Sequence, residues 1–191
     1  PALTTISQRM ATGIDSFALL AIPFFILSGE LMNKGGVAHR LVAFAKALVG
    51  FLPGGLALIN VISAMLMGSV AGSAMASASA MGSILGPEME KEGYSKGFGV
   101  AINITSATTG LLIPPSNILI VYSLASGGAS IAALFLAGYI PGILTGLFLM
   151  AVAMIWAKKK NFKTGKRAPL KTVFNSFVRA FPSLILLFVV I

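Results

Sequence analysis

The sequence predicts an all-α integral membrane protein whose transmembrane helices include one re-entrant helical hairpin and one helix broken by two prolines. The chain has 191 residues, of which 57% are hydrophobic and only 10% charged. Its mean hydropathy of +0.94 exceeds what a single soluble core requires. Two stretches without any charged side chain, residues 47–87 and 98–157, each contain small or helix-breaking residues near the middle. Polar, irregular backbone is therefore expected at membrane depth.

The composition also excludes several classes of function. The formal net charge is +9, but the basic residues lie in short segments between apolar runs, which is typical of the positive-inside topology rather than of a nucleic-acid surface. Cysteine is absent and His39 is the single histidine. Thiolate metal sites are thus excluded, and His39 has no second imidazole for a metal. A membrane enzyme is disfavoured because neither irregular segment contains His, Asp, Glu or Cys.

Residues 1–52 are predicted to contain an interfacial helix, a spanning helix and an amphipathic arm helix. Residues 1–14 have apolar side chains spaced like one helical face. Residues 16–32 form an apolar run that is expected to span the membrane with a kink at Pro23. Glu30 lies at the end of this run, so a solvated carboxylate or a pair with Lys34 is favoured over a proton relay.

The arm helix is expected at residues 37–51. Val37, Leu41, Phe44, Ala45 and Leu48 share one face, whereas the basic side chains of this segment point elsewhere. This pattern predicts a helix that lies on the cytoplasmic surface of the membrane.

Residues 53–87 are predicted to form the re-entrant hairpin. The middle of this segment is a run of glycine, alanine, serine and methionine from residue 67 to residue 83. A turn near residues 69–73 would leave arms of about fourteen residues, or ~21 Å, which is less than a membrane crossing. Two ordinary spans packed through small residues are the alternative. Glycines at a turn would expose backbone groups to a ligand.

Residues 97–126 are predicted to form the broken transmembrane helix. Pro114 and Pro115 have no N–H, so the carbonyls of Gly110 and Leu111 would lose their helical donors. We expect one half-helix to end near Thr108 and a second to begin near residue 116. Lipid cannot satisfy the freed carbonyls, so this backbone must be buried in protein or line a watered cavity.

The remaining segments are simpler. Residues 129–157 are predicted to span the membrane, residues 158–172 to form a basic cytoplasmic loop, and residues 173–191 to begin the next segment. The apolar run at residues 181–191 is too short to span, so we expect the chain to be a fragment of a longer membrane subunit. In this scheme every basic loop lies on one side of the membrane. Two full spans in place of the hairpin would return the chain to the same side, so the positions of the basic loops fit both alternatives.

The hairpin turn and the proline break are both expected to offer binding groups for an anion and for a cation at the same depth in the membrane. A half-helix start favours an anion, and an unwound helix end offers free carbonyls that favour Na⁺. Ser116 or Asn117 can cap the second half-helix, and a capped helix start is expected near Ser73. The candidate cavity-lining or substrate residues, all next to a break, are Ser73, Thr108, Thr109, Ser116 and Asn117. Local bonding back to the helix backbone is expected for Ser77, Ser79 and Ser83.

Both breaks resemble those of the large membrane subunit of tripartite ATP-independent periplasmic (TRAP) transporters. The residues that carry the resemblance are Phe17–Met32, Gly68–Ala74, Gly110–Ser116 and Gly138–Gly142. The family often has Ser-Gly-Ser at its hairpin tip, whereas this chain has Ala71-Gly72-Ser73. A hydroxyl at position 71 is therefore absent, although a backbone carbonyl remains.

The resemblance implies an elevator-type secondary transporter of the bacterial inner membrane, of which one inverted repeat is present here. It implies Na⁺-coupled import of an organic acid such as a C4-dicarboxylate or sialic acid, with no cofactor besides Na⁺. The implied partners are a small membrane subunit and a periplasmic binding protein. The implied sodium site, built mainly from backbone oxygens, consists of Gly68, Ala71, Gly110, Ile113 and Pro115. An ion channel, or a symporter without a binding protein, is the alternative function.

Overall fold

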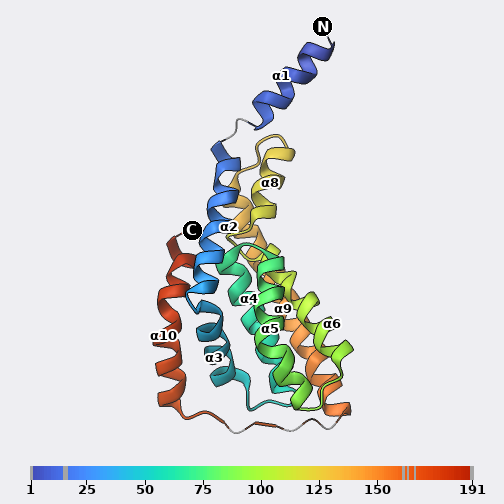
Figure 1. Ribbon diagram of the computed structural model, residues 1–191, viewed down its shortest axis with the longest axis vertical. Helices are drawn as coiled ribbons and strands as arrows, with labels where there is room; N and C mark the ends of the chain where they lie inside the picture. The colour runs from blue at the N-terminus through green and yellow to red at the C-terminus, as the bar shows by residue number, and fades with distance from the viewer. Residues whose placement is uncertain (1, 15–16, 161, 163, 166, 190–191) are drawn as a thin grey trace.

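The computed structural model describes residues 2–14, 17–160, 162, 164–165 and 167–189, and within these ranges the chain forms helices and no strand (Figure 1). The helices are α1 Ala2–Ile14, α2 Phe17–Lys34, α3 Val37–Val49, α4 Gly55–Ala71, α5 Ala74–Lys91, α6 Lys96–Ala107, α7 Thr109–Leu112, α8 Asn117–Ala125, α9 Ile131–Lys159 and α10 Leu170–Val189. The fold is therefore all-α, as the sequence predicts.

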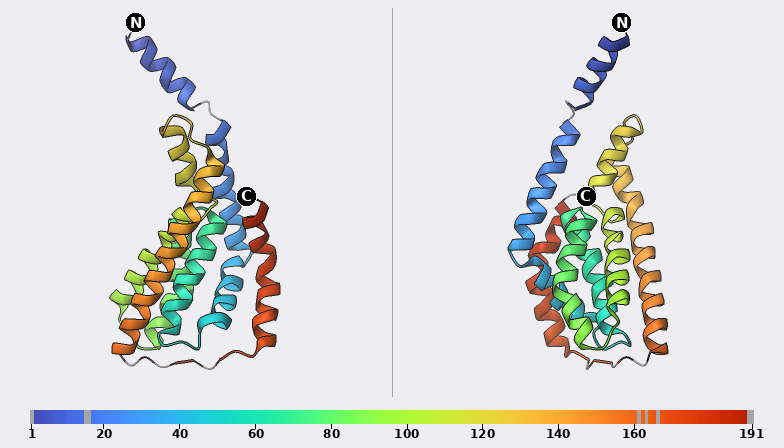
Figure 2. Two further views of the ribbon diagram at one scale, coloured as in Figure 1. Left: turned by 180° about the vertical axis from the view of Figure 1, so that it is seen from behind. Right: turned by 45° about the vertical axis from the view of Figure 1, so that its right-hand side comes forward.

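Helix α4 is the centre of the bundle. It contacts α2, α3, α5, α6, α7, α9 and α10, and fourteen of its seventeen residues are buried. A helix that is apolar on all sides is stable only when neighbours cover all of them. Helices α9 and α10 lie on opposite sides of α4 (Figure 2).

Helices α4 and α5 form an antiparallel pair that turns at Gly72 and Ser73, within the range predicted for the hairpin turn. The arms contain 17 and 18 residues, so they are longer than the fourteen expected. The second arm is longer because α5 continues through Pro87 to Lys91 instead of ending at the proline. An arm of 17 residues is about 26 Å long, which is still short of the roughly 30 Å hydrocarbon core.

The helical chain after residue 96 is interrupted at the two prolines. Helix α6 is followed directly by the single turn of α7, which ends at Leu112, and helical structure resumes at Asn117. The axis of α8 is bent by 52° from that of the preceding segment. The first half-helix thus extends four residues beyond its expected end at Thr108, because the last residue that can donate a helical bond is Ile113, to Thr109.

Helix α3 is amphipathic as predicted, but most of its apolar face is covered, and Leu48 is the exposed member of that face. Val37, Leu41 and Ala45 are buried, and α3 packs along α4 and α10 (Figure 1). The sequence pattern predicted that the membrane surface covers the apolar side chains of α3. In the structure α4 and α10 cover most of them. Lys46 also reaches Glu88 of α5 in an ion pair of 3.7 Å. Both side chains are about half exposed, so this pair contributes at most about 1 kcal/mol.

The two ends of the chain differ in how they pack. Helix α1 extends away from the bundle (Figures 1 and 2), and its apolar residues Leu3, Ile6 and Met10 are exposed. Helix α10 begins at Leu170, which is earlier than the segment start expected at residue 173. Its buried residues Ala180 and Leu184 belong to a cluster with α3 and α4. The sequence scheme placed this start later because it counted Lys171 with the basic loop.

One helix among the described residues, α9, is long and apolar enough to cross a membrane by itself. The bent segment from Lys96 to Ala125 adds a second candidate if its two parts are counted as one span. Helix α4 is apolar but shorter than a span. Helix α2 runs through Pro23 without ending.

Candidate functional site

The candidate site lies where the turn of the α4–α5 hairpin meets the interruption between α7 and α8. Gly72 adopts a left-handed conformation with φ 61°, and its N–H donates to the Gly68 carbonyl at 2.7 Å. The Gly72 carbonyl in turn accepts from the N–H of Asn117 at 3.4 Å. One glycine therefore ends α4 and connects the hairpin turn to the first residue of α8.

A close backbone contact joins the same two elements one turn away. The backbones of Gly68 and Gly110 touch, so that a Cβ added to either glycine would overlap the Cα of the other. A Cβ added to Gly72 would also lie 2.9 Å from the Pro115 carbonyl oxygen. Glycine is thus required at positions 68 and 110 because two backbones touch there. At position 72 it is required both by the left-handed turn and by the approach of Pro115.

Two further elements hold this junction in place. Gly138 and Gly142 of α9 lie against Leu112 and Ile113, where a Cβ would overlap the Leu112 carbonyl oxygen or lie 2.6 Å from Ile113 Cγ1. On the other side, Gly29 of α2 lies against Ala71, with a built Cβ 3.2 Å from the Ala71 Cβ. The sequence segments Phe17–Met32 and Gly138–Gly142 therefore support the two breaks rather than form a separate site.

The interruption removes the helical donors of the Gly110 and Leu111 carbonyls, as expected, but a side chain supplies a donor to one of them. Gly110 is followed four residues later by Pro114, which has no N–H, so its carbonyl has no helical donor. The Leu111 carbonyl, also expected to be free, accepts instead from the hydroxyl of Ser116 at 2.6 Å. Since a carbonyl oxygen has two lone pairs, Leu111 retains one acceptor position.

The candidate hydroxyls differ in what they do. Ser73 caps α5 as predicted, accepting from the N–H of Ala76 at 3.4 Å. Ser116 precedes α8 but makes no side-chain cap, because its hydroxyl is bonded to Leu111. The capping expected of Ser116 is therefore wrong. Asn117 is the first residue of α8 and does not cap it either.

Thr108 and Thr109 direct their hydroxyls back to their own helix. Thr108 Oγ1 donates to the Thr105 carbonyl at 2.7 Å, and Thr109 Oγ1 donates to the Ser106 carbonyl at 2.6 Å. Thr109 is fully buried, whereas Thr108 is exposed. Only the hydroxyl oxygens' remaining lone pairs are available to a ligand in this arrangement.

Two serines expected to bond locally behave differently from each other. Ser83 bonds to the Ala80 carbonyl three residues earlier, as expected. Ser77 instead donates across the hairpin to the Ala64 carbonyl at 3.1 Å. Ser77 therefore connects the two arms, because small residues let α4 and α5 approach closely enough for a hydroxyl to reach the opposite backbone.

Asn117 brings an unsatisfied oxygen to the junction. Its Oδ1 is buried without a hydrogen-bond partner and lies 3.5 Å from the position of a Cβ built on Gly72. A buried acceptor of this kind costs about 1–3 kcal/mol unless a donor or a cation satisfies it. The side chain is therefore placed to contribute an oxygen ligand beside the hairpin turn.

Replacing Ser116 with alanine is expected to lower thermal stability. The change removes the bond to the Leu111 carbonyl and leaves that half-buried carbonyl without its partner, at a cost of about 1–3 kcal/mol. For a protein of this size we expect the midpoint of unfolding to fall by roughly 2–10 °C. Thermal unfolding of the purified protein in detergent measures the effect, with Ser79→Ala, at an exposed position of α5, as the matched control. An equal shift in both variants would contradict the assignment.

Comparison with known proteins shows the family. The family model of the tripartite ATP-independent periplasmic transporter, DctM component, matches residues 1–191. The YgiK protein of Salmonella typhimurium, described as uncharacterized, is 56% identical over 190 residues, which are 100% of this chain and 44% of that protein.

Two relatives with named substrates are also similar. The C4-dicarboxylate TRAP transporter large permease DctM of Pseudomonas aeruginosa is 42% identical over 177 residues, covering 93% of this chain and 41% of that protein. The sialic acid TRAP transporter large permease SiaM of Vibrio cholerae is 39% identical over 179 residues, covering 94% and 42%. The chain thus spans less than half the length of these curated relatives.

The two relatives that are named for a substrate are both described as large permease proteins of TRAP transporters. The chain belongs to the DctM family of TRAP transporter components.

Proposed function

We propose that this chain is the sodium-binding repeat of a TRAP transporter large subunit that couples Na⁺ entry to import of an organic acid. The observation that carries the proposal is the junction of two helix ends. The hairpin turn and the interruption are joined by the bond from Asn117 to Gly72 and by the contact of Gly68 with Gly110. Two unwound elements meeting in this way can supply several hard oxygens without an acidic residue.

The proposed sodium ligands are mainly backbone oxygens of Gly68, Ala71, Gly110, Ile113 and Pro115. The Ala71 carbonyl belongs to the last turn of α4, where helix carbonyls have no helical donors. The Gly110 carbonyl has no helical donor either, because Pro114, four residues later, has no N–H. The Gly68 carbonyl already accepts from Gly72, so it would contribute its second lone pair.

The proposed substrate is a carboxylate. Helices α5 and α8 both begin beside the junction, directly after Ser73 and Ser116, and their N-terminal amides favour an anion. Ser73 accepts from Ala76 N–H but keeps its own hydroxyl proton to donate to a carboxylate, whereas Thr108, Thr109 and Ser116 donate theirs to backbone carbonyls. Asn117 would take part through its Nδ2, since its Oδ1 can only accept. The named substrates of relatives include C4-dicarboxylates and sialic acid, which are both organic acids.

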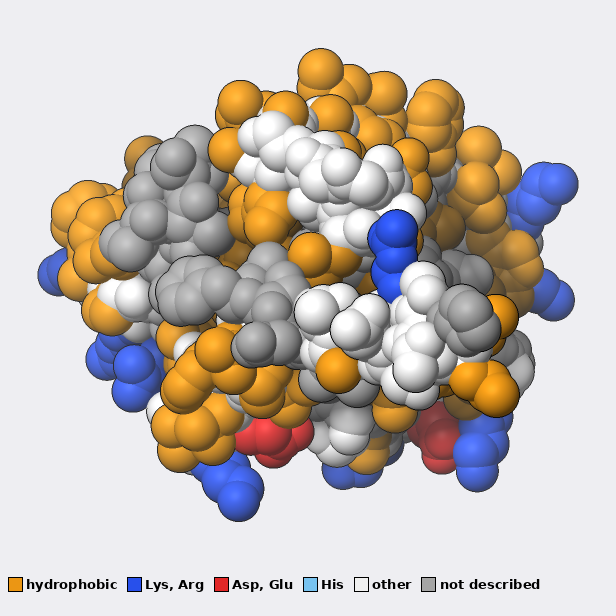
Figure 3. Space-filling view, turned by 90° about the horizontal axis from the view of Figure 1, so that it is seen from above, with side chains coloured by type: hydrophobic (Ala, Val, Ile, Leu, Met, Phe, Trp, Pro, Cys, Tyr) orange, Lys and Arg blue, Asp and Glu red, His pale blue; other side chains and the backbone are white. Residues whose placement is uncertain are grey.

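The proposed membrane placement puts the hairpin turn at mid-membrane, as a re-entrant hairpin, in a multi-pass protein of the bacterial inner membrane. Helix α9 supplies a span whose outward residues Leu136, Ile140 and Phe148 are 61%, 70% and 69% exposed. In the view along the long axis, apolar side chains lie around much of the outer edge of the molecule (Figure 3). The lipid bilayer would cover these surfaces.

The topology of α9 gives a direct prediction. A cysteine at Lys160, next to Lys158 and Lys159, is expected to react with a membrane-impermeant maleimide only from the cytoplasm. A cysteine at Gly128, which precedes α9 and is exposed, is expected to react only from the periplasm. Labelling of intact and permeabilised cells measures both, and the chain has no native cysteine to interfere. The opposite pattern would reverse the proposed orientation.

The proposed transport cycle requires partners beyond this chain. A periplasmic binding protein would deliver the substrate, a small membrane subunit would stabilise the fixed part of the transporter, and the hairpin unit would move as an elevator. Uptake into liposomes containing the complete transporter tests the whole proposal, using a panel of organic acids with and without Na⁺ and the binding protein. Uptake that is independent of Na⁺, or confined to neutral sugars, would overturn it.

A further inference from the structure

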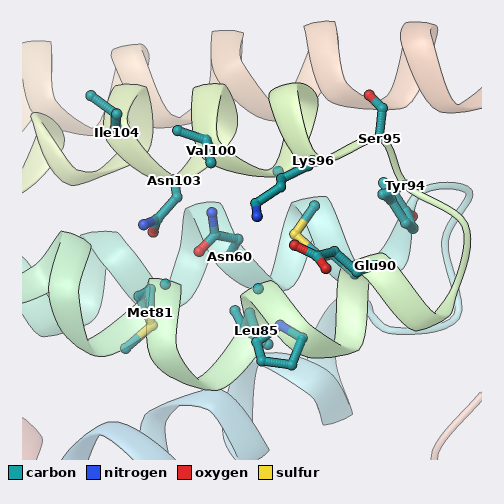
Figure 4. A pocket seen from close by; sticks show the side chains of 15 residues that line it. Asn60, Met81, Leu85, Glu90, Tyr94, Ser95, Lys96, Val100, Asn103 and Ile104 are labelled. Atoms are coloured by element: carbon teal, nitrogen blue, oxygen red, sulfur yellow. The ribbon is translucent and has the colours of Figure 1, made fainter.

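A cavity lies away from the proposed sodium site. It has a volume of about 500 Å³ and is lined by residues of α4, α5 and α6 and of the loop between α5 and α6 (Figure 4). None of the proposed sodium or substrate residues lines it. Its occupant is therefore a separate question from the transport site.

The inner part of the cavity contains amide groups without partners. Asn60 of α4 is fully buried, and neither its Oδ1 nor its Nδ2 has a hydrogen-bond partner. Asn103 of α6 donates to the Ala78 carbonyl at 2.8 Å, but its Oδ1 is also unpartnered. Buried amides are rarely left unsatisfied, so this space is built for a polar occupant. Sequence reasoning missed Asn60, although an asparagine inside the apolar run at residues 56–62 was a visible signal.

Opposite charges face the same space from two helices. The side chains of Glu90 from α5 and Lys96 from α6 converge on the cavity beside Asn60 (Figure 4). Within the described part of the chain the ion pair that forms is Lys46 with Glu88. The Glu90 carboxylate and the Lys96 ammonium group therefore do not contact each other, and a ligand can lie between them. A simple cation would be repelled by Lys96 and a simple anion by Glu90. A ligand carrying both an ammonium and an anionic group matches both side chains.

An aromatic cluster places the cavity mouth at the level of lipid headgroups. Tyr94 stacks on Phe162 with ring centroids 4.0 Å apart, and Phe98 stacks on Trp156 at 3.8 Å. Amphipathic rings gather at membrane interfaces, and Lys158 and Lys159 end α9 at the same level. Burial, with a smaller contribution from Glu92, raises the pKa of Tyr94 to about 12, so its hydroxyl stays protonated.

The wall above the mouth is apolar and open. Val100 and Ile104 line the cavity and are 50% and 58% exposed. They follow Lys96 along α6, one and two turns further from the charged mouth. A ligand that fills the mouth with a headgroup could therefore lay hydrocarbon along α6.

We infer that the cavity binds an aminophospholipid through its zwitterionic headgroup. Glu90 receives the ammonium, Lys96 contacts the phosphate, and Asn60 donates to a phosphate or ester oxygen while Asn103 accepts from the ammonium. The inference rests on the proposed membrane placement but not on the sodium site. A soluble zwitterion such as phosphoethanolamine shares the headgroup chemistry but gains nothing from the apolar wall.

The test uses the full-length permease that contains this chain, purified in detergent. Short-chain phosphatidylethanolamine, short-chain phosphatidylglycerol and free phosphoethanolamine are titrated separately, and the shift in melting temperature gives each affinity. We expect phosphatidylethanolamine to bind about tenfold or more tightly than phosphatidylglycerol, and free phosphoethanolamine to bind more weakly still. Equal affinity for the two lipids would overturn the inference, as would equal affinity for the free zwitterion or no binding of any probe.

Matched variants separate the cavity from general surface charge. Glu90→Gln, Lys96→Gln and Asn60→Leu are each expected to weaken phosphatidylethanolamine binding by about tenfold. Glu92→Gln and Lys91→Gln, whose residues do not line the cavity, are expected to leave it unchanged. Unaltered binding in both Glu90→Gln and Lys96→Gln would overturn the inference even if Asn60→Leu fails to fold. The Na⁺ concentration for half-maximal uptake is expected to stay the same in Glu90→Gln. A result that contradicts the lipid inference can therefore be told apart from one that contradicts the proposed sodium site.

Discussion

Replacing Gly68 with valine is expected to reduce Na⁺-driven uptake by roughly tenfold to a hundredfold. Any Cβ at this position overlaps the Cα of Gly110, so backbone must move against backbone. Overpacking of this kind costs about 1–3 kcal/mol, and about 1.4 kcal/mol corresponds to a factor of ten. Separation of α4 from α7 would also pull apart the oxygens proposed to bind Na⁺. Initial rates of substrate uptake in proteoliposomes measure the loss.

The matched control is Gly97→Ala. Gly97 lies at the start of α6, in the same broken segment as Gly110, but a Cβ there meets nothing within 4 Å. Alanine also favours a helix over glycine by about 1 kcal/mol, so Gly97→Ala is expected to insert and transport normally. If Gly68→Val transports like Gly97→Ala, with the same sodium dependence, the glycine contact is not part of the cation site.

The positions of the two breaks could be predicted because local chemistry determines them. A single proline does not end a helix in this chain, since α2 continues through Pro23 and α5 through Pro87. Pro114 and Pro115 remove two successive N–H donors, and α7 ends at Leu112. The turn of the hairpin was similarly marked by Gly72 next to Ser73, a left-handed glycine followed by a capping serine. These signals need no knowledge of the neighbouring helices.

The partners of the freed groups could not be predicted, because they depend on tertiary structure or on competing local bonds. Ser116 was equally able to cap α8 or to bond to the Leu111 carbonyl, and in the bent segment after the prolines its hydroxyl bonds to Leu111. Ser77 bonds across the hairpin to Ala64, a residue thirteen positions away. The contact between Gly68 and Gly110 likewise joins segments whose approach the sequence does not encode locally.

Asn60 illustrates the same limit for a whole cavity. Its position in an apolar helix was visible, but nothing nearby in the sequence indicated that Asn103, Glu90 and Lys96 would surround the same space. A single polar residue in an apolar run has many explanations. Only the packing of α4 against α5 and α6 shows that its amide is left without a partner.

Replacing both Pro114 and Pro115 with alanine is expected to raise the Na⁺ concentration needed for half-maximal uptake. The two new N–H groups become available to the carbonyls of Gly110 and Leu111, and the bond from Ser116 to Leu111 must then compete with a helical donor. Each regained backbone bond is worth about 0.5–1.5 kcal/mol. Two such bonds amount to about 1–3 kcal/mol, or roughly 5- to 150-fold in sodium affinity.

The effect on sodium must be separated from a general loss of the fold. The double variant is expected to insert normally, because continuous helix satisfies its own backbone in lipid, and to leave substrate recognition by the separate binding protein unchanged. Ser79→Ala, on an exposed position of α5, is expected to keep the original sodium dependence. A double variant with the original sodium dependence would mean that the interruption serves only to bend the chain by 52°. The cation would then have to bind elsewhere, because Gly110 would have regained its donor without any effect on transport.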